Sequence, residues 1–328
     1  MRRSLLRTLL LLGVLSVATF ALAELAPGDY AAEMRLDPRL SRASLEVLRQ
    51  RYHLDESWFS RYLSWLGSVL HGELGYSFAH QVPVAELLRP RLAATLVLTL
   101  SATSLAWLTA LALGTAAAAR PRGLADRLLA LLSAALLALP ELLLLLLLLA
   151  WASSFGLPLG GMRSLDADQL GAFAALADLL RHLLLPAVAL AAGLLPTLLR
   201  HVRAAMAGAF AESSYAAARG HGLGPYRLFF SYALPGSAAT LLPLAGLSFG
   251  GLLSSSLLIE IVFSWPGIGP LFLDAILARD LHLATAVLLA SGVLLAAGNA
   301  LADLALLALD PRRRSAGDGG IRPAEEPE

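Results

Sequence analysis

Long apolar runs dominate the chain, and short polar segments separate them. Six stretches are long and apolar enough to cross the hydrocarbon core, which takes roughly 20 residues of helix. We expect spans at residues 5–25, 93–119, 126–153, 183–205, 238–262 and 281–309. Because backbone groups inside lipid must pair within the protein, the pattern predicts an all-α, polytopic membrane protein with six transmembrane helices.

The first apolar stretch has a second interpretation. Basic residues at its start, followed by an apolar run and Ala21-Leu22-Ala23, are also typical of a cleavable signal peptide. On this segment alone, a retained helix and a cleaved signal peptide remain equally open.

Arginines near the expected helix ends predict the orientation. They occur before the first span, between the second and third, between the fourth and fifth, and after the last: Arg2, Arg3, Arg7; Arg120, Arg122, Arg127; Arg200, Arg203, Arg219, Arg227; Arg312, Arg313, Arg314. Short loops rich in arginine stay in the cytoplasm, so both termini are expected there.

Residues 26–92 are expected to form an external segment, and residues 310–328 a disordered cytoplasmic tail. Apolar residues at helical spacing predict short amphipathic helices within the external segment. They are Leu45, Leu48 and Tyr52, then Trp58, Tyr62, Trp65, Leu66 and Val69. Residues 93–309 would form the pore domain.

Composition narrows the function further. Hydrophobic residues make up 57% of the 328 positions and charged residues 15%, with a net charge of +1, so neither nucleic acid nor an acidic substrate is indicated. All 25 basic residues are arginine, which excludes a P-loop lysine and hence ATP hydrolysis by that route. The chain has no cysteine, and its seven histidines are scattered, so no metal site or cofactor is expected.

The segment 207–235, between the fourth and fifth expected spans, is rich in small residues and turn formers. A small-residue helix is expected to end at the glycine-rich turn around Gly222, where a positive φ is tolerated. Pro225 favours the start of a second helix, and Pro235 is expected to end it. Aromatic residues of that helix facing the cytosol would mark a docking surface. Alternatively, the segment packs on the protein's own helices.

This segment resembles the coupling loop of ABC importer permeases. The family pattern is Glu-Ala-Ala, three residues, Gly, nine residues, an apolar residue, one residue, and Leu-Pro. The matching positions here are Ala217, Ala218, Gly222, Tyr232, Leu234 and Pro235. Ala216 stands where the pattern has Glu, a departure common among peptide-type members.

Other motifs resemble the dipeptide, oligopeptide and nickel importer branch of that family. They follow in order as LAPGD at residues 25–29, GELGYS at 72–77, EIVFSWPGIG at 260–269, and Asn299, Asp303 and Asp310-Pro311-Arg312 near the end. The first motif favours a retained helix at residues 5–25. The third is similar to the family's external turn, so Glu260, Pro266 and Gly267 are candidate residues of that turn.

The resemblance implies a type I ABC importer permease fold and a permease subunit lining half of a translocation pathway in the bacterial inner membrane. Its implied partners are a second, similar permease, cytoplasmic ATPases that bind ATP and Mg²⁺, and an extracytoplasmic solute-binding protein. The cargo stays open among dipeptides, oligopeptides, nickel and other solutes.

A few polar residues and prolines interrupt the expected spans. Glu141, after Pro140, lies near the middle of the third span, where it is either a pathway residue or a cap at a kink. Asn299 and Asp303 share a helix face and suit bonding to a neighbouring helix. Pro186, Pro196 and Pro243 predict bent or broken helices.

Two other functional classes would place different demands on the sequence. An ion-gradient-driven transporter would use buried carboxylates such as Glu141 and Asp303, but the chain shows no internal repeat. An intramembrane hydrolase would need histidine inside a span, whereas His182, His201 and His282 lie at span ends.

Overall fold

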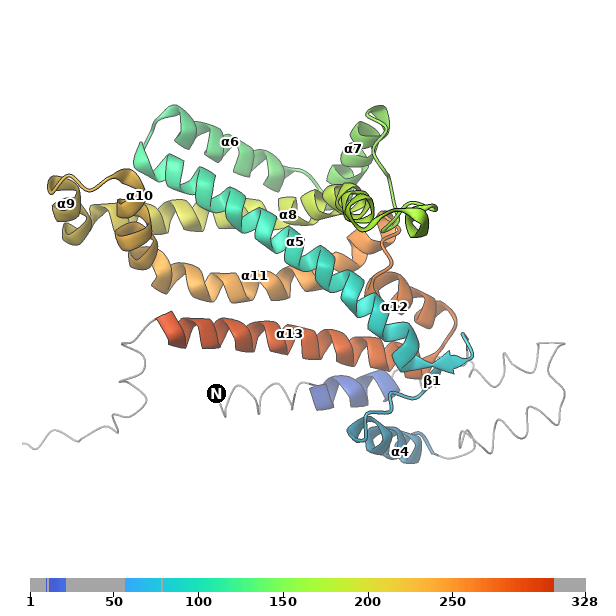
Figure 1. Ribbon diagram of the computed structural model, residues 1–328. Coiled ribbons are helices and arrows are strands. Elements are labelled where there is room, and N and C mark those ends of the chain that lie inside the picture. Colours follow the sequence, from blue (N-terminus) through green and yellow to red (C-terminus); the bar gives the residue numbers. More distant parts are fainter. Residues whose placement is uncertain (1–9, 11, 22–56, 78, 310–328) are drawn as a thin grey trace, which may run out of the picture. The chain divides into compact units, whose positions relative to one another are not determined.

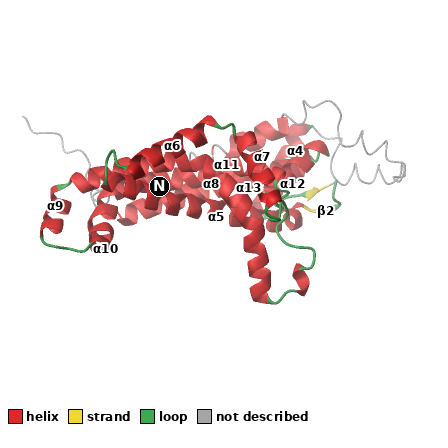
Figure 2. Ribbon diagram, turned by 90° about the horizontal axis from the view of Figure 1, so that it is seen from above, coloured by secondary structure: helices red, strands yellow, loops and turns green. Residues whose placement is uncertain are grey.

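The computed structural model describes residues 10, 12–21, 57–77 and 79–309, without the side chains of residues 168 and 301–309. The regular secondary structure of the described part is helical apart from one pair of two-residue strands (Figures 1 and 2). The all-α class is therefore confirmed. The expected helix at residues 45–52 and the expected tail at residues 310–328 lie outside the described residues.

The elements follow one another with short connections. Their bounds are α4 (Trp58–Leu70), β1 (Tyr76–Ser77), β2 (Val82–Pro83), α5 (Val84–Ala119), α6 (Leu124–Ala138), α7 (Glu141–Ser154), the 3₁₀ turn η1 (Ala167–Gln169), α8 (Ala172–Ala211), α9 (Ser213–Gly220), α10 (Pro225–Leu228), the π-helical turn η2 (Phe229–Ala233), α11 (Leu234–Val262), α12 (Ile268–Leu277) and α13 (Leu281–Leu309). The strands β1 and β2 are antiparallel and pair Tyr76 with Pro83 and Ser77 with Val82.

Four helices are long and apolar enough to cross a membrane: α5, α8, the run Pro225–Val262 that ends in α11, and Leu281–Ala300 of α13. The pair α6 and α7 adds a fifth candidate span if the two bent helices are counted together. The first expected span, at residues 5–25, is described only in part and contains the shorter apolar helix Leu12–Ala21. The count of six transmembrane helices therefore stays a prediction.

The third expected span is not one straight helix. Its two halves, α6 and α7, meet at an angle of 106°. Leu139 is extended, with φ −85° and ψ 124°, as is usual for the residue before a proline. Pro140 is the N-cap of α7 and lacks the N–H that would continue the helical ladder. The kink expected at this proline is thus a full break.

Pro186, Pro196 and Pro243 do not break their helices, so of the two expected outcomes, a bent or a broken helix, a break is excluded. The 40-residue helix α8 runs through both Pro186 and Pro196, and α11 runs through Pro243. Each proline removes one backbone hydrogen bond, which long membrane helices tolerate when neighbouring groups compensate.

The described chain divides into two compact units. The first comprises Met1–Leu98, Pro158–Leu183 and Ser256–Ala296, and the second comprises Thr99–Leu157, Leu184–Ser255 and Ala297–Glu328. The helices α5, α8, α11 and α13 contribute residues to both units.

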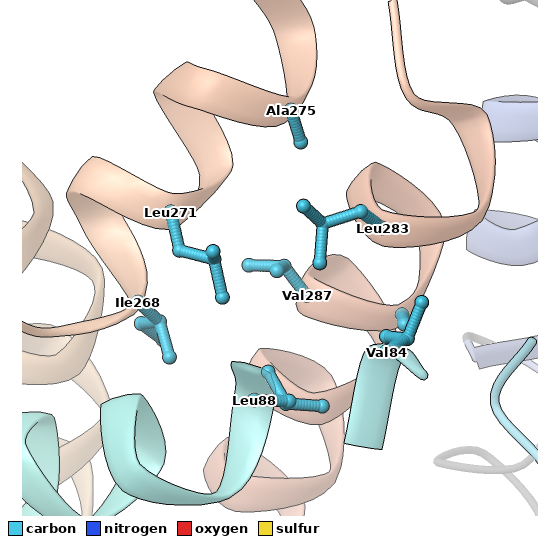
Figure 3. Close-up of a cluster of buried hydrophobic side chains, with 8 residues drawn as sticks. Val84, Leu88, Ile268, Leu271, Ala275, Leu283 and Val287 are labelled. Atoms are coloured by element: carbon cyan, nitrogen blue, oxygen red, sulfur yellow. The ribbon is translucent and has the colours of Figure 1, made fainter. Parts of the chain in front are cut away.

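The first unit has an apolar core where α5 begins. Buried side chains of α5, α12 and α13 converge there (Figure 3): Val84, Leu88, Ile268, Leu271, Ala275, Leu283, Ala286 and Val287. Burial of Val84 and Leu88 gives the early turns of α5 an apolar face, so this helix starts well before the expected residue 93.

A smaller cluster in the same unit holds α4 against the helix Leu12–Ala21. The rings of Phe20 and Trp65 are 5.0 Å apart, and those of Phe20 and Tyr62 are 5.3 Å apart in an edge-to-face arrangement. The hydroxyls of Ser16 and Tyr62 are 3.0 Å apart and share a hydrogen bond. The Ser57 hydroxyl caps α4 by accepting from the backbone N–H of Ser60. The amphipathic helix expected from Trp58 onward is therefore present.

The second unit packs α5 closely against α8. A Cβ added at Gly114 would lie 2.8 Å from Val202 Cγ1 and 3.2 Å from the backbone N of Arg203. Glycine therefore allows the two backbones to approach, as small residues commonly do between membrane helices. Leu198, Val202 and Met206 form a buried stripe along this part of α8.

Candidate functional site

The 207–235 segment forms a compact arrangement of short helices between α8 and α11 (Figure 1). The chain leaves α8 at Ala211, turns at Glu212, and forms α9, a four-residue turn, α10 and the π-helical turn η2. The connections are too short for a long flexible loop, so this part of the chain has one defined path.

The turn after α9 depends on Gly222. The N–H groups of His221 and Gly222 donate to the carbonyls of Ala217 and Arg219, each at 3.0 Å, which closes the end of α9. Gly222 has φ +78°, in the left-handed region that favours glycine. No described atom lies within 4 Å of where its Cβ would be, so the requirement for glycine is conformational and not steric.

Small and apolar side chains anchor this segment, while aromatic ones project from it. Ala218, Leu228 and Ala233 are buried. Tyr226 is 76% exposed and Phe230 49% exposed, with their ring centroids 4.6 Å apart. An exposed pair of tilted rings in contact, carried on buried anchors, is an apolar surface suited to docking.

The six residues matched to the coupling-loop pattern divide by exposure. Ala217, Gly222 and Pro235 are exposed, Ala218 is buried, and Tyr232 and Leu234 are half-buried. The pattern residues therefore shape the segment and do not form one contact face. The sequence pattern does not contain the exposed ring pair, although exposed aromatics were expected here.

Pro235 does not end the second helix, contrary to expectation. It is the second residue of α11, and the helical run Pro225–Val262 is continuous through the π-helical turn η2. Pro235 has no N–H to donate back into this run, and it directly follows the π turn, where the Leu234 N–H donates to the Phe229 carbonyl. The wider π turn η2, directly before α11, accommodates the absence of the hydrogen bond that Pro235 cannot make.

The turn between α11 and α12 is organised around the carboxyl group of Glu260, which is fully buried. Thr95 of α5 donates to Glu260 Oε1 at 2.6 Å, and the backbone N of Gly269 donates to Oε2 at 2.7 Å. The Thr95 hydroxyl in turn accepts from the backbone N of Ile268 at 2.9 Å. This network satisfies a buried carboxyl and ties α5, α11 and α12 together within the first unit.

Glycine and tryptophan complete that turn. A Cβ at Gly267 would overlap the Glu260 carboxyl group, so glycine is needed there for close approach. Trp265 is buried, and its indole N–H donates to the Ala94 carbonyl at 2.9 Å. Pro266 is half-buried between these two residues. Glu260, Pro266 and Gly267 thus belong to one turn, in which Glu260 accepts the hydrogen bonds.

At Asp280 the GELGYS motif meets the segment that follows the EIVFSWPGIG motif. Its Oδ2 accepts from the Ser77 hydroxyl at 2.6 Å and from the Ala79 backbone at 3.2 Å, and its Oδ1 accepts from the Leu283 backbone at 3.1 Å. Asp280 therefore caps α13 and fixes the β1 strand beside it. The sequence alone contains Ser77 and Asp280, but no signal that these two residues are in contact.

The sequence pattern of the family described as "Binding-protein-dependent transport system inner membrane component" matches residues 110–315. The chain belongs to this family. The match includes the whole 207–235 segment and the Glu260 turn, so both structures described above lie within the family's defining region.

Similarity to curated members extends over nearly the whole chain. It is 31% identical over 314 residues to the oligopeptide transport system permease protein AppB of Bacillus subtilis, covering 95% of this chain and 97% of that protein. The probable peptide ABC transporter permease protein y4tP of Sinorhizobium fredii gives 31% over 314 residues, 95% and 98% of the two chains. The nickel import system permease protein NikB of Staphylococcus aureus gives 27% over 312 residues, 94% and 90%.

As a member of this family, the chain is a permease component of an ABC importer in the inner membrane and not an enzyme. ATP hydrolysis takes place in separate ATPase subunits. Within the described residues, no group of three or more His, Asp or Glu side chains is arranged to hold a metal ion.

The remaining candidate residues belong to none of these turns. Glu141 is the first residue of α7, at the break after Pro140, and its side chain is exposed. The apolar run predicted Glu141 near the middle of a continuous span, and the break after Pro140 shows that this position is wrong. Asn299 is exposed on α13, and Asp303 belongs to the same helix beyond the described side chains.

Proposed function

We propose that this permease subunit forms half of the translocation pathway of an ATP-driven importer and transmits movement from a separate ATPase through the 207–235 segment. The observation that carries the proposal is the exposed ring pair Tyr226 and Phe230 on buried anchors. Closure of ATPase subunits on ATP and Mg²⁺ would move this segment as one body, because its connections are short.

The substrate we propose is a peptide or a related small solute. The relatives are named for oligopeptides, peptides and nickel, and a further one, GsiC of Escherichia coli, for glutathione at 27% identity. Peptide names accompany the two matches at 31% identity, which favours peptides over nickel.

The proposed assembly contains a second, similar permease, cytoplasmic ABC ATPases and an extracytoplasmic solute-binding protein. We place both termini and the 207–235 segment in the cytoplasm because these parts of the chain carry arginine clusters, and short arginine-rich segments stay in the cytoplasm. An ion-gradient-driven carrier, the alternative suggested by Glu141 and Asp303, has no support from membership of an ABC importer family.

The test is a double substitution, Tyr226→Ala with Phe230→Ala, in the complex reconstituted with its ATPases, binding protein and a peptide mixture. We expect membrane insertion to be normal and substrate-stimulated ATP turnover to fall at least about tenfold, the size of effect seen when interface anchors are truncated. Phe173→Ala removes an aromatic ring outside the segment that is 85% exposed, more than either ring of the pair, and is the control. Unchanged turnover in the double variant, or uptake that survives removal of the ATPase, would contradict the proposal.

A further inference from the structure

An open groove in the second unit lies between α6 and α8 where both helices carry arginines. Its volume is about 590 Å³, within the range of small-molecule sites. Arg122, Arg127, Arg200 and Arg203 line it, together with an apolar wall that includes Leu129 and Leu137. One part of the groove lining is therefore basic, and another part is apolar.

Within the described residues, acidic side chains do not balance the positive charge in this groove. Asp126 is the acidic residue in the lining, and it is already engaged by Arg203, which donates to both carboxylate oxygens, and by the Arg122 backbone at 2.8 Å. Among the described residues, no acidic side chain pairs with the guanidinium groups of Arg122, Arg127 and Arg200. Arg200 Nε donates to the Pro196 carbonyl. Guanidinium groups without an acidic partner suit a phosphate, which arginine binds through several donors.

A buried hydroxyl in the groove also lacks a partner. Ser133, on α6, is 4% exposed, and its Oγ has no hydrogen-bond partner among the described residues. It lines the same groove, six residues after Arg127, which is about 9 Å along a helix. A buried hydroxyl without a partner is costly, so an occupant with an oxygen acceptor at this depth would relieve it.

The groove has an apolar wall that suits hydrocarbon. Leu129, which is buried, and Leu137, which is 56% exposed, form part of this wall. In a membrane protein such a wall lies against acyl chains. An occupant of the groove can therefore have its charged part at the arginines while its tail continues along α6.

We propose that this groove is a binding site for an anionic phospholipid. The phosphate is held by Arg122, Arg127 and Arg200, an ester oxygen accepts from Ser133, and an acyl chain lies along Leu129 and Leu137. Arginine-rich pockets between membrane helices at the cytoplasmic side are a known setting for such headgroups. A free phosphate or nucleotide would leave the apolar wall and Ser133 unused.

The first test measures lipid selectivity of the full-length purified chain by native mass spectrometry. Equal amounts of phosphatidylglycerol and phosphatidylcholine with the same acyl chains are the probes. We expect preferential phosphatidylglycerol adducts, reduced on the order of tenfold in an Arg122→Gln, Arg127→Gln double variant, since each basic residue near a membrane surface contributes several-fold. Arg120→Gln removes a neighbouring charge that does not line the groove and should change nothing.

The second test keeps the arginines intact. Because the chain has no cysteine, Leu137→Cys provides a single position for a fluorophore inside the groove. In the complex reconstituted into bilayers, brominated phosphatidylglycerol should quench this fluorophore at least about twofold more than brominated phosphatidylcholine at the same mole fraction.

Three results would overturn the proposal. Equal quenching by the two lipids would show no anionic preference. No quenching by either lipid would show that a partner subunit covers the groove. Displacement of phosphatidylglycerol by millimolar inorganic phosphate would show that the site takes a free anion.

Discussion

At the scale of single residues, two carboxyl groups organise the connections of the first unit. Glu260 accepts from Thr95 and Gly269, and Asp280 accepts from Ser77 and from the first turn of α13. In both cases the acceptor is buried and each of its oxygens has a donor. Such networks fix the path of the chain more than they increase its stability.

Gly267 provides a direct test of the Glu260 turn. Its φ of −94° is open to any residue, so only the overlap with the Glu260 carboxyl group forbids a side chain there. We expect Gly267→Ala to destabilise the chain by about 1–3 kcal/mol through overpacking. The measurement is thermal unfolding of the detergent-solubilised chain.

A double-mutant cycle separates this cause from a general loss of packing. Glu260→Ala removes the overlapping group, so Gly267→Ala should cost much less in that background than in the original chain. Gly251→Ala, at a helical position with no described atom within 4 Å of the added Cβ, is the control and should be neutral or slightly stabilising. Equal costs of Gly267→Ala in both backgrounds would refute the steric account.

The residues of this turn show what the sequence can and cannot predict. Glu260, Pro266 and Gly267 are recognisable as one turn because they are close together in the chain. Thr95, which completes the network, is 165 residues away from Glu260 and has no local signal. The exposed ring pair at Tyr226 and Phe230 was predictable only as a helix with exposed aromatics.

At the scale of elements, the length of the apolar runs predicted where helices lie in the chain. It did not predict where they begin, where they bend or how they are connected. The start of α5 at Val84 follows from packing against α12 and α13, which no apolar run encodes. The break at Pro140 and the continuity at Pro186 and Pro196 involve the same residue type. Whether a proline breaks a helix therefore depends on its surroundings, and the sequence alone does not supply them.

Gly222 tests the element that joins α9 to α10. A β-branched residue in the left-handed region is strained by at least about 1 kcal/mol, so Gly222→Val should alter the path of the turn. We expect normal folding and insertion but loss of substrate-stimulated ATP turnover in the assembled complex.

Two matched variants make that test specific. Gly222→Asn should restore much of the turnover, because asparagine tolerates the left-handed conformation. Gly220→Val places the same side chain at an equally open position without a positive φ and should keep the stimulated activity. Equal losses for Val at both positions would mean that bulk, and not backbone conformation, matters there.

At the scale of the whole molecule, the topology depends on whether α6 and α7 together cross the membrane. Their 106° bend is compatible with a broken span or with a re-entrant pair that returns to the side it started from. The arginine clusters favour a crossing, because Arg120 and Arg219 then both face the cytoplasm. Counting apolar runs predicted a span at 126–153 but contained no information on the bend.

Single-cysteine labelling decides between these topologies, and the absence of native cysteine makes each label unique. If α6 and α7 cross, an impermeant maleimide added to intact spheroplasts should label His80→Cys and Phe173→Cys but not Ser231→Cys. All three positions are exposed, so permeabilised cells should label each of them and provide the control. If the pair is re-entrant, residue 173 shares the side of Arg120, and α8 then carries Ser231 to the opposite side. Labelling of Ser231→Cys from outside would therefore remove the 207–235 segment from the reach of any cytoplasmic ATPase.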